Sequence, residues 1–282
     1  MPIQHLLLPT NLSSNSGNAV AYGIKLANVL QVRKITILHT YAANNAIANQ
    51  PVISAGIPEM LQDEQNELDN LKLNVQSQVG TDVTVTTYLA EGKLVHVSYD
   101  LISNKGVDLI VMGISTKTKL EQNLIGSNAI NVIRKTNCPV IVVPDNASWV
   151  SHPNIAVAID ITHDTNRIPI EKVKNVFKQM DGSKLYLVNI EDEDDHSTHI
   201  QNPNIEKINY TFSDWNTKLE ILSSPNKAKA IENYCTDRSI HLLVLFERKY
   251  GILDTIFRKS LIRQIAYQAS TPILVIAELP EV

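Results

Sequence analysis

Residues 108–144, DLIVMGISTKTKLEQNLIGSNAINVIRKTNCPVIVVP, hold the pattern from which the fold of this chain is predicted. The apolar run 109–112 has the composition of a strand that is buried on both faces, and Gly113 ends it. A polar segment follows. Apolar residues at the spacing of one helix face then come after Gly126, and Pro139 begins a second apolar run. The pattern predicts a strand, a long loop, a helix and another strand.

The loop between these strands carries the residues of an anion-binding site. Gly113 has no Cβ, so a ligand can approach the backbone where the strand ends. Gly126 and Ser127 at the helix start offer free N–H groups and a hydroxyl, and the helix dipole favours an anion there. The alternative interpretation is a turn glycine with an ordinary serine N-cap. Lys117 is equally compatible with a phosphate contact and with solvent exposure.

The spacing within this loop resembles the nucleotide loop of the universal stress protein family. The family pattern is glycine, two residues, glycine, nine residues, glycine, and then serine or threonine. This chain has Gly113, two residues, Thr116, nine residues and then Gly126-Ser127. The run 138–143, CPVIVV, is also similar to the closing strand of that family. Thr116 departs from the pattern, because ATP-binding members have a glycine at that position.

The resemblance implies an adenine nucleotide, ATP, bound to the first half of the chain. The backbone at Gly113 would face the phosphates, the start of the following helix would hold them, and the ends of the first two strands would line the adenosine. The complete set implied is Pro9, Thr10, Asn11, Thr40, Met112, Gly113, Thr116, Lys117, Gly126, Ser127 and Asn128. Asn11 stands where the family usually has an aspartate. A Mg²⁺ ion is therefore left open, and no metal ligand is assigned.

The second half of the sequence repeats the first. Pro139 aligns with Pro272, an offset of 272 − 139 = 133, and the same offset aligns Ser127 with Ser260. Near the start of each half the offset is 149, which aligns Asn11 with Asp160. Strand and helix patterns alternate in each copy, as in a doubly wound α/β domain with a five-stranded, mainly parallel sheet. We therefore expect two tandem domains, 1–146 and 153–282. The resemblance implies the adenine nucleotide alpha hydrolase type of fold, with the closing strands 140–143 and 273–276 near a pseudo-twofold axis.

The two copies differ at the loop. The aligned pairs there are Gly113 with Phe246, Thr116 with Lys249, and Gly126 with Lys259. Side chains thus fill the space that glycines leave for phosphates, which predicts a degenerate second domain and a single nucleotide per chain. The alternative is that the added cations meet an acidic ligand. The second half is also shorter by 149 − 133 = 16 residues, and an acidic, Asn-rich region is predicted to replace the helix that follows the second strand.

Composition narrows the class of protein. The chain has 282 residues, 44% of them hydrophobic, with a formal net charge of −4, which argues against a nucleic-acid-binding protein. Two cysteines make no disulfide framework, and Cys138 is predicted to be packed in the interior. The N-terminal residues do not resemble a signal peptide, and no apolar run has the length of a membrane span. We expect a cytoplasmic protein that does not bind a membrane.

Patterns of enzymatic catalysis are missing from the sequence. It contains no G-x-S-x-G elbow and no Walker-type loop. His5, His39 and His96 have no partner serine or cysteine in view, and the acidic run 191–195 is predicted to be a solvated loop rather than a metal site. We therefore expect a stress-response or regulatory protein that binds ATP without substantial catalysis, with an unidentified protein partner, and the homodimer left open. The alternatives are an interaction scaffold that has lost nucleotide binding and a slow ATPase.

Overall fold

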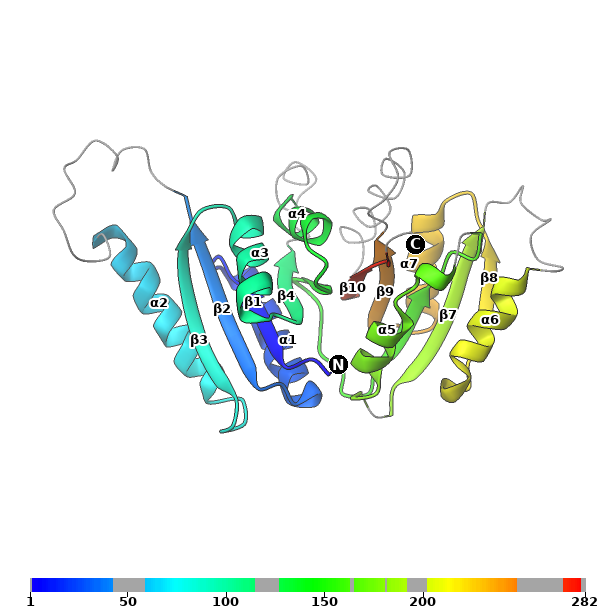
Figure 1. The fold of residues 1–282 in the computed structure, drawn as a ribbon, viewed down its shortest axis with the longest axis horizontal. Coiled ribbons are helices and arrows are strands. Elements are labelled where there is room, and N and C mark those ends of the chain that lie inside the picture. The colour runs from blue at the N-terminus through cyan, green and yellow to red at the C-terminus, as the bar shows by residue number, and fades with distance from the viewer. Residues whose placement is uncertain are drawn as a thin grey trace.

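A computed structural model of the chain describes residues 2–42, 59–114, 127–162, 165–180, 182–191, 202–247 and 271–279. Its strands form one ten-stranded sheet with the order β3-β2-β1-β4-β5-β10-β9-β6-β7-β8 (Figure 1). Within each half the neighbouring strands are parallel, so the predicted α/β class with two five-stranded halves is confirmed. No helix among the described residues is both long and apolar enough to cross a membrane.

The first half alternates strands and helices. Its elements are β1 (His5–Pro9), α1 (Ser14–Leu30), β2 (Lys34–Tyr41), α2 (Glu59–Gln76), β3 (Thr84–Glu91), α3 (Leu94–Lys105), β4 (Leu109–Ile114), α4 (Ser127–Lys135) and β5 (Val140–Pro144). Every residue of β1 and β5 is buried, as their continuous apolar sequences predict. Both lie inside the ten-stranded sheet, whereas β3, with its polar residues, lies at the edge.

The second half repeats this order with shorter helices. Its elements are β6 (Asn154–Ala158), η1 (Thr165–Arg167), α5 (Ile170–Phe177), β7 (Lys184–Glu191), α6 (Pro203–Thr211), η2 (Ser213–Trp215), β8 (Leu219–Ser223), α7 (Lys227–Asp237), β9 (Leu242–Glu247) and β10 (Ile273–Ala277).

One sequence prediction is wrong in this half, because the Asn-rich region does contain a helix, α6. Asn202 caps its first turn by accepting a hydrogen bond from the backbone N–H of Asn204, 3.0 Å away. Pro203 occupies a first-turn position, where its fixed φ suits a helix and its missing N–H costs nothing. The asparagine and proline that suggested a loop are thus the residues that start the helix.

Helices cover both faces of the sheet, and the strands are apolar on both. Alternate residues of β1, Leu6 and Leu8, share one hydrophobic core with α1 and α2, while Leu7 belongs to the core on the side of α3 and α4. Each of the two cores continues through both halves of the chain. In Figure 1, α3 and α4 lie in front of the first half of the sheet and α5 lies in front of the second half.

The two halves join through antiparallel pairing of β5 with β10. Ile141 pairs with Leu274, and both side chains are fully buried. The sequence offset of 133 also makes Leu274 the equivalent of Ile141, since 141 + 133 = 274. Two equivalent residues that face each other across an antiparallel pair lie on a twofold axis. The predicted position of the closing strands at a pseudo-twofold interface is therefore confirmed.

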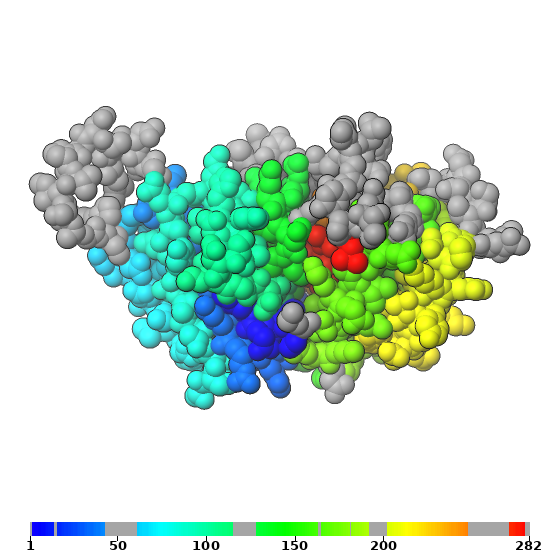
Figure 2. All heavy atoms as spheres, viewed as in Figure 1, coloured from blue at the N-terminus to red at the C-terminus, as the bar shows by residue number. Residues whose placement is uncertain are grey.

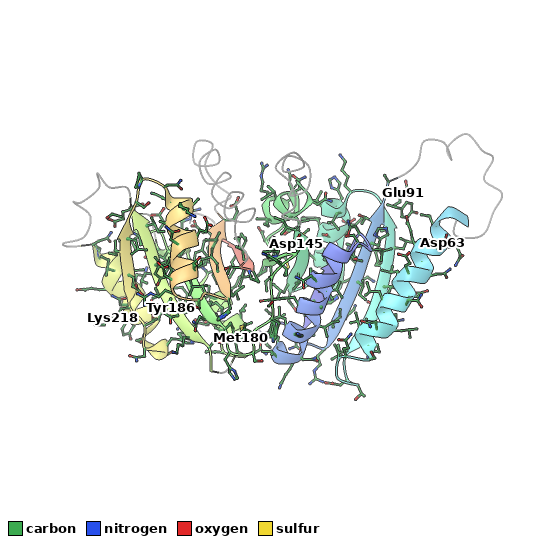
Figure 3. The ribbon with its side chains drawn as sticks, turned by 180° about the vertical axis from the view of Figure 1, so that it is seen from behind. Asp63, Glu91, Asp145, Met180, Tyr186 and Lys218 are labelled. Atoms are coloured by element: carbon green, nitrogen blue, oxygen red, sulfur yellow. The ribbon has the colours of Figure 1, made fainter. Side chains whose placement is uncertain are left out.

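The segment between β5 and β6 is held against the first half. The amide nitrogen of Asn18 in α1 donates to the carbonyl oxygens of Pro144, at 2.9 Å, and of Ala147, at 3.1 Å. Trp149 then packs edge-on against Tyr22, with ring centroids 5.0 Å apart. Figure 3 shows Asp145, the residue after β5, near the middle of the molecule, so the connection runs close to the join. Figure 2 shows the two halves in contact as one continuous body.

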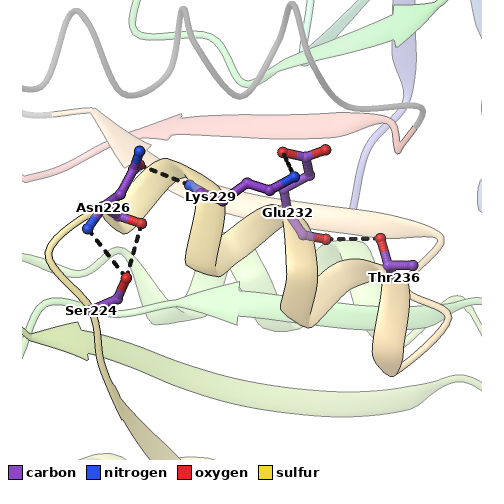
Figure 4. A network of polar contacts seen from close by, with 5 residues as sticks. All are labelled: Ser224, Asn226, Lys229, Glu232 and Thr236. Carbon is purple, nitrogen blue, oxygen red and sulfur yellow. Dashed lines mark hydrogen bonds and ion pairs between the residues drawn. The ribbon is translucent and has the colours of Figure 1, made fainter.

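The α3 and α7 helices occupy equivalent positions but begin differently. In α7, Asn226 is the N-cap, and its side chain accepts a hydrogen bond from the N–H of Lys229 at 3.0 Å (Figure 4). Ser224 Oγ accepts from the N–H of Asn226 at 3.2 Å and so fixes the entry to the helix. In α3 the N-cap is Lys93, which makes no side-chain capping bond. The second half has thus kept, and locally reinforced, its structural elements.

Candidate functional site

The strand order of the first half reverses direction between β1 and β4. From β1 the chain moves outward to β2 and β3, and then returns to place β4 on the other side of β1. In doubly wound sheets, ligands bind beyond the carboxyl ends of the strands at such a topological switch point. The carboxyl ends of β2, β3, β7 and β9 lie toward the top of Figure 1, so both halves present this edge on the same side of the molecule.

Two residues predicted for the site lie at matching positions on the two sides of this switch point. Leu6 of β1 pairs with Leu109 of β4 and Leu7 pairs with Ile110, and the same offset of 103, carried to the strand ends, aligns Thr10 with Gly113. Thr10 is buried and follows the last residue of β1, while Gly113 is partly exposed and is the next-to-last residue of β4. Because Gly113 carries no side chain, the space beside Thr10 is not filled from β4.

The polar side chains of the loop from β1 to α1 form hydrogen bonds within the loop. Ser16 Oγ donates to the carbonyl of Ser13 at 2.8 Å, so the Thr10 hydroxyl is the donor in its 2.9 Å bond to Ser16 Oγ. Thr10 Oγ1 also accepts from the N–H of Leu12 at 3.0 Å. This bond holds Leu12 at a φ of 59°, an uncommon value for a residue with a Cβ. The loop therefore has one well-defined backbone path.

The side chain of Asn11 is also hydrogen-bonded within this loop. Its Oδ1 atom accepts from the N–H of Ser13 at 3.3 Å and from the Ser13 hydroxyl at 2.7 Å. The side chain predicted to line the adenosine thus folds back on the start of α1. What the loop offers to a ligand is its backbone rather than the Asn11 amide.

His39 is a residue of this region that the sequence analysis did not include. It is buried near the end of β2, and its Nδ1 atom lies 2.8 Å from the carbonyl oxygen of Thr10. A carbonyl only accepts, so Nδ1 carries the proton. On the other side of the ring, Nε2 lies 3.5 Å from Oε2 of Glu64 in α2. The sequence signal was a polar residue within an apolar strand, two positions before its end, but nothing in the sequence pointed to Glu64.

The remaining predicted residues divide into three groups. Pro9 is buried at the end of β1, Thr40 lies one residue before the end of β2 on the face opposite His39, and Met112 is buried in the core beneath α3 and α4, where its side chain serves packing. Ser127 begins α4, and Asn128 is exposed in its first turn. Thr116, Lys117 and Gly126 lie outside the described residues, as do residues 43–58 of the long loop after β2.

The switch point of the second half is filled. Ile155 of β6 pairs with Leu242 of β9, and the same offset of 87, carried past the last pair Val157–Val244, aligns Ile159 with Phe246. These residues are the equivalents of Thr10 and Gly113. Ile159 is buried in the core beside α5, and Phe246 packs against that core. A hydroxyl and a glycine in the first half are therefore replaced by two apolar side chains in the second.

The loop after β6 is also held by different hydrogen bonds from those of the loop after β1. Asn189, at the position of His39, accepts a hydrogen bond from the N–H of Ile161 at 3.4 Å and donates to Glu191 Oε1 at 3.0 Å. The amides of Asn202 and Asn204 donate to the carbonyl of Ile161 at 3.2 and 2.9 Å. Glu191 is buried at the end of β7, so the prediction that the run 191–195 is solvated is wrong for this residue; the rest of the run lies outside the described residues.

The described residues contain neither a reactive thiol nor a metal cluster. Burial raises the pKa of the Cys138 thiol to about 12, and its Sγ lies 3.7 Å from the carbonyl of Val107, so the predicted packing role of Cys138 is confirmed. Burial likewise raises the pKa of Cys235 to about 12. No group of three or more His, Cys, Asp or Glu side chains in the described part of the chain is arranged to hold a metal ion.

Comparison with known proteins identifies the family. The model of the universal stress protein family matches residues 2–144. Two universal stress proteins of Methanocaldococcus jannaschii are similar to about half of this chain. MJ0577 is 28% identical over 157 residues, which cover 49% of this chain and 93% of that protein; MJ0531 is 30% identical over 142 residues, which cover 49% and 80%.

Solved structures extend the likeness to both halves. A universal stress protein from Archaeoglobus fulgidus is 17% identical and has a TM-score of 0.73 over 97% of this chain and 96% of its own. A protein of unknown function from Pseudomonas aeruginosa, PA1789, is 14% identical and has a TM-score of 0.65 over 98% and 93%. At these identities the likeness concerns the fold alone, and it extends over both halves of this chain. The resemblance inferred from the nucleotide loop is confirmed, and the chain belongs to the universal stress protein family.

Proposed function

We propose that this chain is a stress-response protein that binds one adenine nucleotide, ATP, at the β1–β4 switch point of its first half, without substantial catalysis. The observation that carries the proposal is the contrast between Thr10 with Gly113 in the first half and Ile159 with Phe246 in the second. Only the first pair leaves space at the position where doubly wound sheets bind ligands.

The start of α4 adds to this argument. Ser127 opens the nine-residue helix α4, which is the next element of the chain after β4. The unpaired N–H groups and the dipole of a helix start favour an anion such as a phosphate. Thr10, Asn11 and Thr40 would then lie on the nucleoside side, with Asn11 contributing backbone rather than side chain.

Low catalytic activity follows from what phosphoryl transfer requires. That reaction depends on placed cations, a metal ion and a positioned nucleophile. The described residues at the switch point supply an asparagine whose amide oxygen is already bonded, and no cluster of metal ligands. We therefore infer that the first half retains a nucleotide and does not turn it over.

The test is calorimetric titration of ATP into the purified chain and two variants. We expect a stoichiometry near one for the wild type. Gly113→Phe, which copies the second half, should weaken binding by about a hundredfold or more, because the ring occupies the ligand space. Phe246→Leu, the matched control at the equivalent position, should leave affinity unchanged. A stoichiometry near two, or equal affinity in the wild type and Gly113→Phe, contradicts the proposed site, and absence of wild-type binding favours an interaction scaffold.

A further inference from the structure

We infer that His39 is a positioning residue of this site, which aims the backbone N–H of Asn11 at the bound nucleotide. The inference rests on the proposed function and adds to it a donor, a residue that orients this donor and a contrast with the second half, where this orienting contact is missing. It starts from the point where β1 separates from β2.

The parallel ladder between β1 and β2 ends at Thr10. The N–H of Thr10 still donates to the carbonyl of Leu38 at 2.8 Å. In a continuing ladder the carbonyl of Thr10 would next accept from the backbone N–H of Thr40. Here the ring of His39 takes that place, with Nδ1 at 2.8 Å from the Thr10 oxygen. A side chain thus holds the last peptide of β1 after the backbone pairing has stopped.

The direction of this bond determines the direction of the next N–H. The peptide bonds of the described residues are all trans, and in a trans peptide the C=O and the N–H point in opposite directions. Since the carbonyl of Thr10 points to β2, the N–H of Asn11 points away from β2. The neighbour of β1 on that other side is β4, where Gly113 leaves space. The Asn11 N–H is therefore directed at the proposed ligand position.

Glu64 borders the other side of the ring. Its Oε2 atom lies 3.5 Å from Nε2 and makes no hydrogen bond within the described part of the chain. The bond from Nδ1 to the Thr10 carbonyl is therefore the hydrogen bond that orients the imidazole. His39 is only 9% exposed, so little solvent competes for the Thr10 carbonyl.

The second half supports the inference by contrast. Asn189 is the equivalent of His39, because β7 begins at Lys184 where β2 begins at Lys34, an offset of 150. Asn189 accepts from the N–H of Ile161 and donates to Glu191, and among the described residues it makes no hydrogen bond to the carbonyl of Ile159, the equivalent of Thr10. The peptide that carries the N–H of Asp160, the equivalent of Asn11, is therefore not held from this position. Loss of this contact accompanies loss of the space, which Phe246 fills.

The test compares two amides at position 39. The side-chain nitrogen of asparagine lies close to the place of histidine Nδ1, whereas that of glutamine reaches the place of Nε2. We expect His39→Asn to bind ATP within about threefold of the wild type, and His39→Gln to bind about tenfold more weakly, the effect of one lost hydrogen bond. Thermal unfolding of both variants controls for their stability. In ¹⁵N-labelled wild type, the amide signal of Asn11 should shift on saturation with ATP.

The outcomes separate this inference from the proposed function. If the wild type binds ATP while the Asn and Gln variants bind equally well, His39 does not position the site. The same conclusion follows if the Asn11 amide signal stays unmoved at saturation, a result that requires no variant. If the wild type does not bind ATP, the proposed function is wrong and the inference is wrong with it.

Discussion

The two halves differ little at the amino ends of their strands, here called the amino edge of the sheet. They differ more at the carboxyl ends, here called the carboxyl edge. At the amino edge, His5 Nδ1 donates to the carbonyl of Lys105 at 3.1 Å in the first half. In the second half, Asn154 Nδ2 donates to the carbonyl of Arg238 at 3.0 Å. The offsets of 149 and 133 make these the same positions, since 5 + 149 = 154 and 105 + 133 = 238. The residues differ, but the hydrogen bond is the same.

A second pair at the amino edge behaves in the same way. The N–H of His5 donates to Asp108 Oδ2 at 3.0 Å, and the N–H of Asn154 donates to Nδ1 of His241, the equivalent residue, also at 3.0 Å. At the carboxyl edge, in contrast, equivalent positions make different bonds and fill different volumes. At the amino edge, backbone groups need hydrogen-bond partners, so a side chain that changes between the halves is replaced by another that makes the same bond. At the carboxyl edge, the space of the first half serves only a ligand, and side chains fill that space in the second half.

The largest expected effect concerns the join, where the halves should behave alike. Ile141→Ala and Leu274→Ala each remove a fully buried side chain on the twofold axis. We expect each to lower the free energy of unfolding by about 4 kcal/mol, the usual cost of such a cavity. The two losses should also agree within about 1 kcal/mol, because the environments are equivalent. Urea denaturation measures both, and a loss confined to one residue would show that the join is not symmetric.

The next prediction tests whether the second site is lost for one reason or several. Phe246→Gly restores the glycine of the first half but leaves a cavity beside Ile159, and it should lower the free energy of unfolding by about 3 kcal/mol. The stoichiometry of ATP binding should remain one, because Ile159 still stands in place of Thr10 and Asn189 does not hold the carbonyl of Ile159 as His39 holds that of Thr10. Calorimetric titration checks this. A second bound nucleotide would mean that the phenylalanine alone closes the site.

The smallest expected effect is a difference in acid sensitivity at the amino edge. Burial lowers the pKa of His5 below the ordinary 6.5, although its hydrogen bond to Lys105 acts in the opposite direction. The unfolded chain therefore binds this proton more readily, and the stability contributed by neutral His5 is fully present above about pH 6.5. It is lost as the pH falls from there through the folded pKa.

His5→Asn copies the residue of the second half and removes this proton. The variant should lose less stability than the wild type between about pH 7.5 and pH 5.5. The measurement is the urea midpoint at both pH values, with His96→Asn as a control for a histidine on the surface of α3. Equal acid sensitivity of wild type and His5→Asn would show that another group dominates the wild-type response.

Much of the fold was predictable because it follows from apolar patterns and from the repeat. The run 109–112 predicted β4, the offset of 133 identified the two closing strands as equivalents, and the family resemblance implied that these strands meet near the axis. The offset carries no information on turn chemistry, so the helix α6 was missed: asparagine and proline are typical of both loops and helix starts. The proposed domain bounds of 1–146 and 153–282 stay predictions.

The candidate site was predictable only in part. Strand ends and a glycine can be identified in a sequence, and these placed Thr10 and Gly113 at one edge. Their juxtaposition depends on strand order and register, which brings together residues about a hundred positions apart. His39 was considered only as a catalytic group lacking a serine or cysteine partner, whereas its contact is a backbone carbonyl. The Glu64 contact depends on how α2 packs on the sheet, which no local pattern reveals.

The β5–β10 pairing has a consequence for how the molecule responds to dilution. Two separate copies that share a strand edge dissociate when their concentration falls, and their apparent stability falls with it. Here the short connection 145–153 keeps the two edges at an effective concentration on the order of millimolar, whatever the concentration of the protein. The first half is therefore always paired with an unlike partner. That partner needs to supply only a strand edge and a core, so its own ligand site can disappear while the sheet that supports the first site stays complete.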